Sequence, residues 1–328
     1  MFEGKCSEGR MNGLEKYDAI DIIGCGSAYH VGLVGKSLIT KYGEVPVYVD
    51  IASEYRYTEH IYSKKHLIIL ISQSGETADT LAVLRKAKEQ GIDTLAIVNV
   101  VGSSIAREAD KVLYIKAGPE IAVATTKAYS CQLMMLSLIA MYLGIKKGNL
   151  GEGILEEYDN LDKLIEKVLV DAKSLEKIAK KIYKKKHIFY LGRKVDYSLC
   201  MEASLKLKEI SYIHSEAYAA GELKHGTISL IEKGTPVISI ITDDDIKYKT
   251  LSNVKEVCAR GALSIIITND SVMDEDIYDV MITIPKVHEL ISPILAIVKC
   301  QLLAYYVAKL NGCDIDKPRN LAKSVTVE

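Results

Sequence analysis

The sequence predicts a duplicated α/β protein in which each half is a mainly parallel sheet flanked by helices. Three observations lead to this fold class. Short apolar runs alternate with stretches of helical period, which argues for parallel strands joined by helices. Most of the runs are continuously apolar, as is typical of strands buried on both faces. The spacing of the runs also repeats in the two halves of the chain.

Eight apolar runs are the predicted strands, four in each half. The starts of the first and second strands are 48 residues apart in the first half and 49 in the second. The starts of the second and third strands are 27 residues apart in the first half and 28 in the second. Such self-similarity indicates duplication of one unit. The predicted strands are Ala19–Ile23, Leu67–Ile71, Thr94–Val98 and Lys111–Ile115, then His187–Leu191, Pro236–Ile241, Ser264–Thr268 and Asp279–Ile284.

These runs predict two subdomains at residues 1–147 and 187–328, joined by a Lys- and Glu-rich helical linker at residues 148–186. The longest apolar stretches are Leu133–Ile145 and Ile291–Ala308. The first is too short to span a bilayer, and the second carries Lys299 and Gln301. Both are therefore predicted to be buried helices, and no membrane partner is expected.

Composition limits the classes of function. Hydrophobic residues make up 48% of the 328 residues and charged residues 26%, which allows a sizeable core. The formal net charge of −1 implies no basic face, so a nucleic-acid partner is not expected. The N-terminus has no apolar signal region. Seven scattered cysteines without C-x-x-C spacing argue against a disulfide framework and against a zinc site, and favour a reducing, cytoplasmic location.

The segment Ser72-Gln73-Ser74-Gly75-Glu76-Thr77 is the most informative motif. It follows the strand Leu67–Ile71 and precedes a helix predicted from Ala78 to Gln90. Such a turn offers hydroxyls, free backbone N–H groups and the positive end of a helix dipole, which together suit a phosphate. The alternative is an ordinary helix cap, because Ser and Thr are frequent N-cap residues.

Other turns differ in what they offer a ligand. In the second half, Asp243, Asp244 and Asp245 follow the equivalent strand, so a phosphate site is predicted in the first half only. Gly24-Cys25-Gly26-Ser27 follows the first strand, but Tyr29 stands where a dinucleotide fingerprint needs a third glycine. Thr125 lies in another hydroxyl-rich turn, which can also simply cap the next helix.

The second half contains two further candidates. Glu202, Lys206 and Glu209 have helical spacings of four and three and therefore share one face, either as a surface salt-bridge cluster or as a half-buried base beside a lysine. His225 lies among small residues in a stretch predicted as a loop or short helix. The final residues, which include Leu321, Val325 and Val327, form a polar tail whose apolar side chains predict that it docks.

The motifs Ser72–Thr77, Lys206–Tyr212, Glu216–Gly226 and Pro318–Glu328 resemble, in order, the isomerase half of the glutamine–fructose-6-phosphate aminotransferases, also called glucosamine-6-phosphate synthases. The resemblance extends from about Ile22 to Glu328. It implies two SIS (sugar isomerase) subdomains, a sugar-phosphate substrate, and a homodimer or larger assembly with shared active sites. It implies neither a metal nor a cofactor.

The resemblance also implies roles. Ser72, Gln73, Ser74 and Thr77 would hold the phosphate, while Ser27, Thr125 and the backbone of Val123 would line the sugar site. Glu209 would move the proton between C1 and C2, with Lys206 beside the reacting end. His225, from the neighbouring subunit, would assist ring opening, and Lys323 on the C-terminal loop would close over the sugar.

Two departures qualify the resemblance. Ala28 stands where the family usually has a serine, so one hydroxyl contact is expected to be lost. Only residues 1–18 precede the first strand, and Cys6 is not the terminal nucleophile of a glutaminase domain. An isolated isomerase domain is therefore expected. The alternatives are a stand-alone glucosamine-6-phosphate deaminase and a sugar-phosphate sensor without turnover, although a sensor would be expected to lack Glu209.

Overall fold

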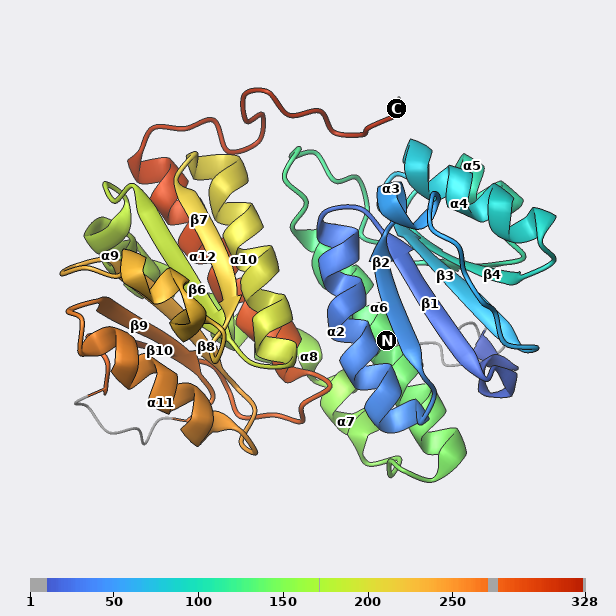
Figure 1. Cartoon of the computed structure of the whole chain (residues 1–328), viewed down its shortest axis with the longest axis horizontal. Coiled ribbons are helices and arrows are strands. Elements are labelled where there is room, and N and C mark those ends of the chain that lie inside the picture. The colour runs from blue at the N-terminus through green and yellow to red at the C-terminus, as the bar shows by residue number, and fades with distance from the viewer. Residues whose placement is uncertain (1–10, 171, 271–276, 327–328) are drawn as a thin grey trace. The chain divides into compact units, whose positions relative to one another are not determined.

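The computed structural model describes residues 11–170, 172–270 and 277–326, which fall into two compact units. The first unit comprises residues 1–121, 125–155 and 322–328, and the second comprises residues 122–124 and 156–321. Each unit contains a five-stranded parallel sheet flanked by helices (Figure 1). The predicted fold class is confirmed.

The first sheet has the strand order β2-β1-β3-β4-β5, and all neighbouring strands are parallel. Every residue of β1 and β3, two of the three inner strands, is buried, because helices cover both faces of the sheet. The strands are β1 (Ala19–Gly24), β2 (Val47–Ile51), β3 (His66–Ser72), β4 (Asp93–Val98) and β5 (Lys111–Tyr114).

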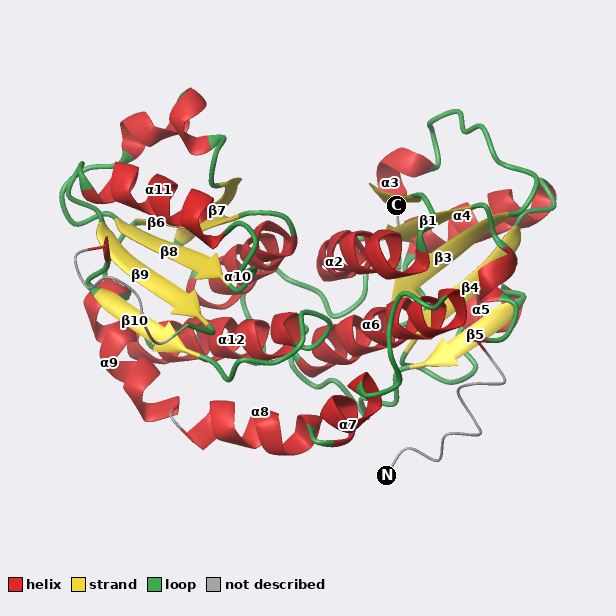
Figure 2. Ribbon diagram, turned by 90° about the horizontal axis from the view of Figure 1, so that it is seen from below, coloured by secondary structure: helices red, strands yellow, loops and turns green. Residues whose placement is uncertain are grey.

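Two helix layers cover this sheet. The long helices α2 and α6 pack against each other on one face, and the shorter helices α3, α4 and α5 lie on the other (Figure 2). The elements are η1 (Leu14–Lys16), α2 (Ser27–Gly43), α3 (Ala52–Tyr55), α4 (Ala78–Glu89), α5 (Ser104–Glu108) and α6 (Lys127–Lys147). Helix α7 (Ile154–Asp159) carries the chain from the first unit into the second.

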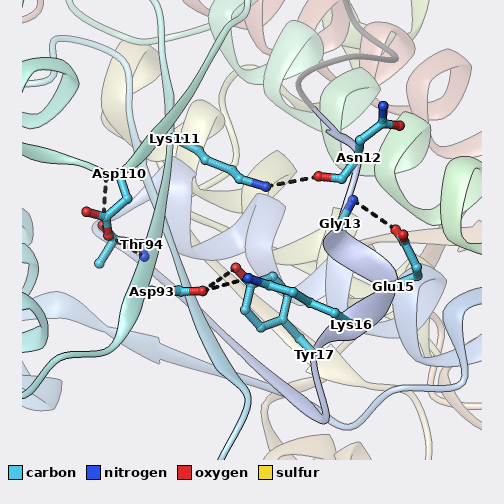
Figure 3. A network of polar contacts seen from close by, with 9 residues as sticks. All are labelled: Asn12, Gly13, Glu15, Lys16, Tyr17, Asp93, Thr94, Asp110 and Lys111. Carbon is cyan, nitrogen blue, oxygen red and sulfur yellow. Dashed lines mark hydrogen bonds and ion pairs between the residues drawn. The ribbon is translucent and has the colours of Figure 1, made fainter.

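A polar network joins the η1 segment to the amino ends of β4 and β5 (Figure 3). Lys16 Nζ and the Tyr17 hydroxyl both donate to Asp93 Oδ2, at 3.1 and 2.7 Å. Lys111 Nζ donates to the carbonyl oxygen of Asn12 at 3.0 Å. Burial, together with the hydrogen bond to Asp93, raises the pKa of Tyr17 to about 12, so this hydroxyl remains a donor at neutral pH.

The second sheet has the order β10-β9-β8-β6-β7, again with parallel neighbours. In the reverse direction the order is β7-β6-β8-β9-β10, in which each strand corresponds to one of β2-β1-β3-β4-β5 in the first sheet. Its strands are β6 (His187–Gly192), β7 (His214–Ala219), β8 (Pro236–Ile241), β9 (Leu263–Thr268) and β10 (Val280–Thr283).

Helices also cover both faces of the second sheet. Helices α10 and α12 pack together, α9 and α8 pack on α12, and α11 lies against β8 and β9 (Figure 2). The elements are α8 (Leu161–Val170), α9 (Ala172–Ile182), α10 (Val195–Ser211), η2 (Leu223–His225), η3 (Thr227–Leu230), α11 (Lys247–Cys258) and α12 (Ser292–Leu310).

Helices α6 and α12 are long and apolar enough to cross a membrane by length and composition alone. Their most apolar windows are, however, 67% and 61% buried inside the protein. They are core helices of their units, as the sequence predicts.

The backbone carries direct evidence of duplication. Gly26 precedes α2 with φ 55° and ψ −123°, and Lys194 precedes α10 with φ 50° and ψ −123°. Both helices are 17 residues long. In each unit the strand before this helix ends in a glycine, because the first turn of the helix leaves no room for a side chain there. A Cβ on Gly24 would lie 2.8 Å from the Ala28 Cβ, and a Cβ on Gly192 would lie 2.5 Å from the Asp196 carbonyl carbon.

All eight predicted strands are present, with ends that differ by at most one residue, and two strands were missed. These are β2 and β7, which lie at sheet edges and carry partly exposed residues. The prediction of a loop or short helix around His225 is correct for η2. The residues His214–Ala219, which precede this stretch, form the unpredicted strand β7 that pairs along β6.

Candidate functional site

The first unit presents hydroxyl groups where two neighbouring strands end. Helix α2 leaves β1 toward β2, whereas α4 leaves β3 toward β4, so the chain direction reverses between β1 and β3. Ligands of such sheets bind outside the carboxyl ends of the strands at this switch point. Ser27 follows β1, and Ser72–Thr77 follows β3. The Cys25 Sγ and Thr80 Oγ1 atoms are 3.9 Å apart, which places the two strand ends side by side.

The hydroxyls of the Ser72–Thr77 loop make hydrogen bonds within the loop itself. Ser72 Oγ accepts the Gly75 N–H at 3.0 Å and lies 2.9 Å from Thr77 Oγ1, while Ser74 Oγ accepts the Glu76 N–H at 3.2 Å. Gly75 has φ +67°, and a Cβ there would lie 2.0 Å from Ser103 Oγ, so this position requires glycine. Gln73 and Ser74 are half-buried in the same loop.

The loop is also anchored from outside. The Gln73 carbonyl accepts the Asn99 N–H, and the Gly75 carbonyl accepts the Ile105 N–H, at 3.2 and 3.0 Å. Glu76 Oε1 accepts the Ser104 N–H at 2.7 Å at the start of α5, and this bond lowers the pKa of the Glu76 carboxyl. These contacts fix the conformation of the loop before any ligand binds. Glu76 is the one charged residue within Ser72–Thr77.

Thr77 occupies the N-cap position of α4, but its hydroxyl makes no capping hydrogen bond. The first N–H of the helix, that of Ala78, instead donates to the Val325 carbonyl oxygen at 3.2 Å. The interpretation of this turn as a helix cap is thus correct in placing Thr77 at the N-cap position. It is wrong in expecting a hydrogen bond from the helix to the Thr77 side chain. The hydroxyl instead lies 2.9 Å from the Ser72 hydroxyl, so this contact joins the two ends of the loop.

The C-terminal tail contacts this loop within the first unit. Ser324 Oγ lies 3.1 Å from Ser74 Oγ, and the Val325 carbonyl accepts from Ala78. Lys323, just before them, is half-buried. Leu321 and Val325, which were expected to dock the tail, are 43% and 58% exposed, so the tail is held by polar and main-chain bonds. Val327 lies outside the described residues.

The second unit carries the charged candidates on α10. Lys206 is 2% exposed, and its Nζ lies 3.5 Å from Glu202 Oε1 and donates to Glu209 Oε2. Glu202 is fully buried, whereas the side chain of Glu209 is 20% exposed. Burial alone would lower the pKa of Lys206, but the two carboxylates outweigh it and raise that pKa. The two carboxylates therefore favour the charged form of Lys206, and Glu209 is the member of the triad that reaches the surface.

Two further predicted residues lie apart from this cluster in the second unit. His225 is exposed at the end of η2, where its N–H donates to the Glu222 carbonyl. Val123 is half-buried, and its N–H donates to the Asp316 carbonyl at 2.9 Å. The segment after α12 is fixed on α10 by Arg319, whose N–H donates to the Tyr212 hydroxyl and whose guanidinium lies over the Tyr212 ring.

Thr125 is half-buried in the first unit, two residues before α6 begins. The hydroxyl-rich turn around it does not cap that helix with a side chain: Thr126 is the N-cap residue and makes no capping bond. The Ala128 N–H is instead bound by Glu120 Oε2 at 2.9 Å.

The equivalent switch point of the second unit is filled by the protein itself. Asp196 lies at the start of α10, in the position that Ala28 has in α2. Its carboxylate accepts the N–H and the hydroxyl of Thr242, at 2.8 and 2.6 Å. Burial raises the pKa of Asp196 to about 6 despite these bonds. A carboxylate at this position would repel a phosphate, as would the carboxylates of Asp243–Asp245.

Asp196 and Ser324 were missed by the sequence reasoning. Asp196 follows its strand at the same distance as Ala28 follows the first, so aligning the two halves could have revealed it. Ser324 gives no local signal, because its contact with Ser74 joins residues 250 positions apart.

The chain is similar to known proteins over most of its length. The model of the family described as "SIS domain" matches residues 13–142 and 181–310. The chain is 53% identical over 320 residues to the glutamine–fructose-6-phosphate aminotransferase [isomerizing] of Caldanaerobacter subterraneus subsp. tengcongensis, and 53% identical over 325 residues to that of Clostridium tetani. Each match covers 96% of this chain but 53% of the relative. The chain thus spans about half the length of these relatives.

Two solved structures extend the comparison. The C-terminal domain of glucosamine-fructose-6-phosphate aminotransferase from Francisella tularensis superposes with a TM-score of 0.89 at 38% identity, covering 95% of this chain and 89% of that one. A glucosamine-6-phosphate deaminase from Thermotoga maritima superposes with a TM-score of 0.77 at 26% identity, covering 98% and 95%.

Proposed function

We propose that this chain, which belongs to the SIS domain family and to its branch of aminotransferase C-terminal domains, interconverts fructose 6-phosphate with an aldose or amino-sugar 6-phosphate. The observation that carries the proposal is the α10 cluster, in which a buried lysine is kept charged beside a glutamate that reaches the surface. A ketose–aldose conversion needs these two chemical functions.

The proposed mechanism uses Glu209 as the base. Its carboxylate takes the carbon-bound proton from C1 of the open-chain ketose and returns it to C2. The intermediate is an enediol-like species with negative charge on oxygen, which a preorganised cation stabilises. Lys206 supplies that cation, because Glu202 and Glu209 hold it protonated. His225 would assist ring opening, and Lys323 would close over the sugar.

The Ser72–Thr77 loop is proposed to hold the phosphate of the substrate. Gln73 and the hydroxyls of Ser72, Ser74 and Thr77 are the donors, and Ser27, Thr125 and the Val123 backbone would line the sugar. The loop lies at a switch point, opens a helix and lacks a side-chain cap, all of which support an anion site. Following the resemblance, we also propose a cytoplasmic homodimer or larger assembly in which His225 serves the neighbouring subunit.

A deaminase is the second candidate, because the superposition on the Thermotoga maritima enzyme covers nearly the whole of both chains. The lower identity and TM-score of that match place it second. Incubation of the chain with fructose 6-phosphate, with and without ammonia, and separately with glucosamine 6-phosphate distinguishes the two. Release of ammonia and ketose from glucosamine 6-phosphate, without the reverse synthesis or isomerisation, identifies a deaminase. Binding without any product identifies a sensor and refutes both.

Replacement of Ser74 and Thr77 by alanine should weaken substrate affinity more than it slows the bound substrate. Hydrogen bonds to a charged group contribute about 1.5–3 kcal/mol each, so the double variant should lose at least ~100-fold in affinity for fructose 6-phosphate. Isothermal titration measures this loss. The matched control replaces Ser53 and Thr58, two hydroxyl residues of the same unit outside the loop. Equal losses for fructose 6-phosphate and unphosphorylated fructose would contradict a phosphate site.

A further inference from the structure

Two histidines stand side by side at the beginning of β6 and β7. His187 and His214 are paired in the parallel register of these strands, so their side chains lie on the same face of the sheet. Their Nδ1 atoms are 3.2 Å apart, and the ring planes meet at 76°. Both residues are exposed, and the His214 side chain is 57% accessible. Two imidazole nitrogens therefore converge at a point that solvent reaches.

The separation of the two nitrogens matches that of ligands on one metal ion. Zn²⁺ binds histidine nitrogen at about 2.0–2.1 Å, and two ligands of a tetrahedral site at that distance are about 3.3 Å apart. Imidazole nitrogen also suits Cu²⁺ and Ni²⁺, but not Mg²⁺, which prefers oxygen ligands. At 3.2 Å one Nδ1–H can also donate to the other Nδ1, so a shared proton is the competing explanation.

The surroundings of His214 follow the pattern of a metal ligand. Glu216, two residues along β7 and on the same face, places Oε1 3.8 Å from His214 Nε2, the ring nitrogen that is turned away from His187. The Tyr218 hydroxyl in turn donates to Glu216 Oε2. Metal-bound histidines commonly have a carboxylate at their second nitrogen, which orients the ring and raises its basicity. No third His, Cys, Asp or Glu completes a cluster among the described residues.

We propose that His187 and His214 form a two-histidine site for a divalent transition ion such as Zn²⁺, with water completing the coordination. The sequence did not reveal this site, because the cysteines lack metal-binding spacing and the two histidines are 27 positions apart in the chain. Strand β7 is the edge strand of its sheet and pairs with β6. A bound ion links these two strands through their side chains and thereby stabilises the edge of the second sheet. The site uses none of the residues proposed for isomerisation.

Titration of the chelator-treated full chain with Zn²⁺, followed by calorimetry and by thermal unfolding, tests the proposal. We expect Zn²⁺ to raise the unfolding temperature and Mg²⁺ to leave it unchanged, because an ion that binds only the folded state stabilises it. His187→Ala and His214→Ala should each weaken Zn²⁺ affinity at least ~10-fold, since even loss of an outer-shell partner costs that much. Glu216→Gln should give a smaller loss in the same direction.

His288→Ala is the matched control, because His288 lies in the same unit and its Nδ1 already accepts the Leu290 N–H at 3.2 Å. This variant should bind Zn²⁺ as the unmodified chain does. Two results overturn the proposal: no Zn²⁺ binding by the unmodified chain, which leaves the shared proton as the explanation, or equal binding by the His187 and His214 variants, which assigns the ion to other ligands such as cysteine thiols.

Discussion

Glu209→Gln should reduce turnover of fructose 6-phosphate at least ~100-fold while substrate affinity remains close to that of the unmodified chain. The substitution removes the base but keeps the shape of the side chain, and general bases typically contribute 10²–10⁴-fold. Lys206 retains Glu202 as a buried partner, so the fold should survive. Exchange of the C1 or C2 proton with solvent deuterium, followed by NMR, measures the proton transfer directly.

Glu176→Gln provides the control for this variant. Glu176 is a solvent-accessible glutamate of the same unit that pairs with Lys180 at 3.2 Å on α9. Its replacement should leave both turnover and affinity unchanged. Near-normal turnover by the Glu209 variant would remove Glu209 from the mechanism, while a parallel loss of affinity and of far-ultraviolet circular dichroism would indicate misfolding rather than loss of a base.

Mixing two inactive variants should restore activity if the active site is shared between subunits. In a dimer of Glu209→Gln and His225→Ala chains, one site combines an intact Glu209 with the intact His225 of the other chain, and the second site carries both lesions. Random pairing makes about half of the dimers mixed, so roughly a quarter of the original activity should return, as two-fold symmetry of the interface requires.

The measurement is the rate of product formation after the mixed chains have exchanged subunits. Exchange is established independently, for example by energy transfer between differently labelled chains. If exchange occurs and no activity returns, every site retains one lesion and His225 serves its own chain. A mixture of Glu209→Gln with Glu176→Gln chains is the control, since one partner in each mixed dimer is then fully competent.

Much of the site could be predicted from sequence because its signals are local. The helical spacing of Glu202, Lys206 and Glu209 predicted a shared face, and the structure brings the three side chains together. The hydroxyls of Ser72–Thr77 follow a strand that its apolar residues identify. What the spacing did not reveal is which of the carboxylates is fully buried, because that depends on the elements that pack on α10.

By itself, the sequence determined the duplicated α/β fold and its central strands, since runs such as Leu67–Ile71 must be buried whatever surrounds them. The tertiary structure alone decided the edge strands β2 and β7 and the main-chain bond that joins the tail to Ala78. A continuous run of apolar side chains signals burial locally in the sequence, whereas single apolar residues such as Leu321 and Val325 do not. Main-chain hydrogen bonds use the N–H and C=O groups, and every residue except proline has both. The sequence therefore does not show which residues pair through these groups, and the partner is decided only when distant segments meet.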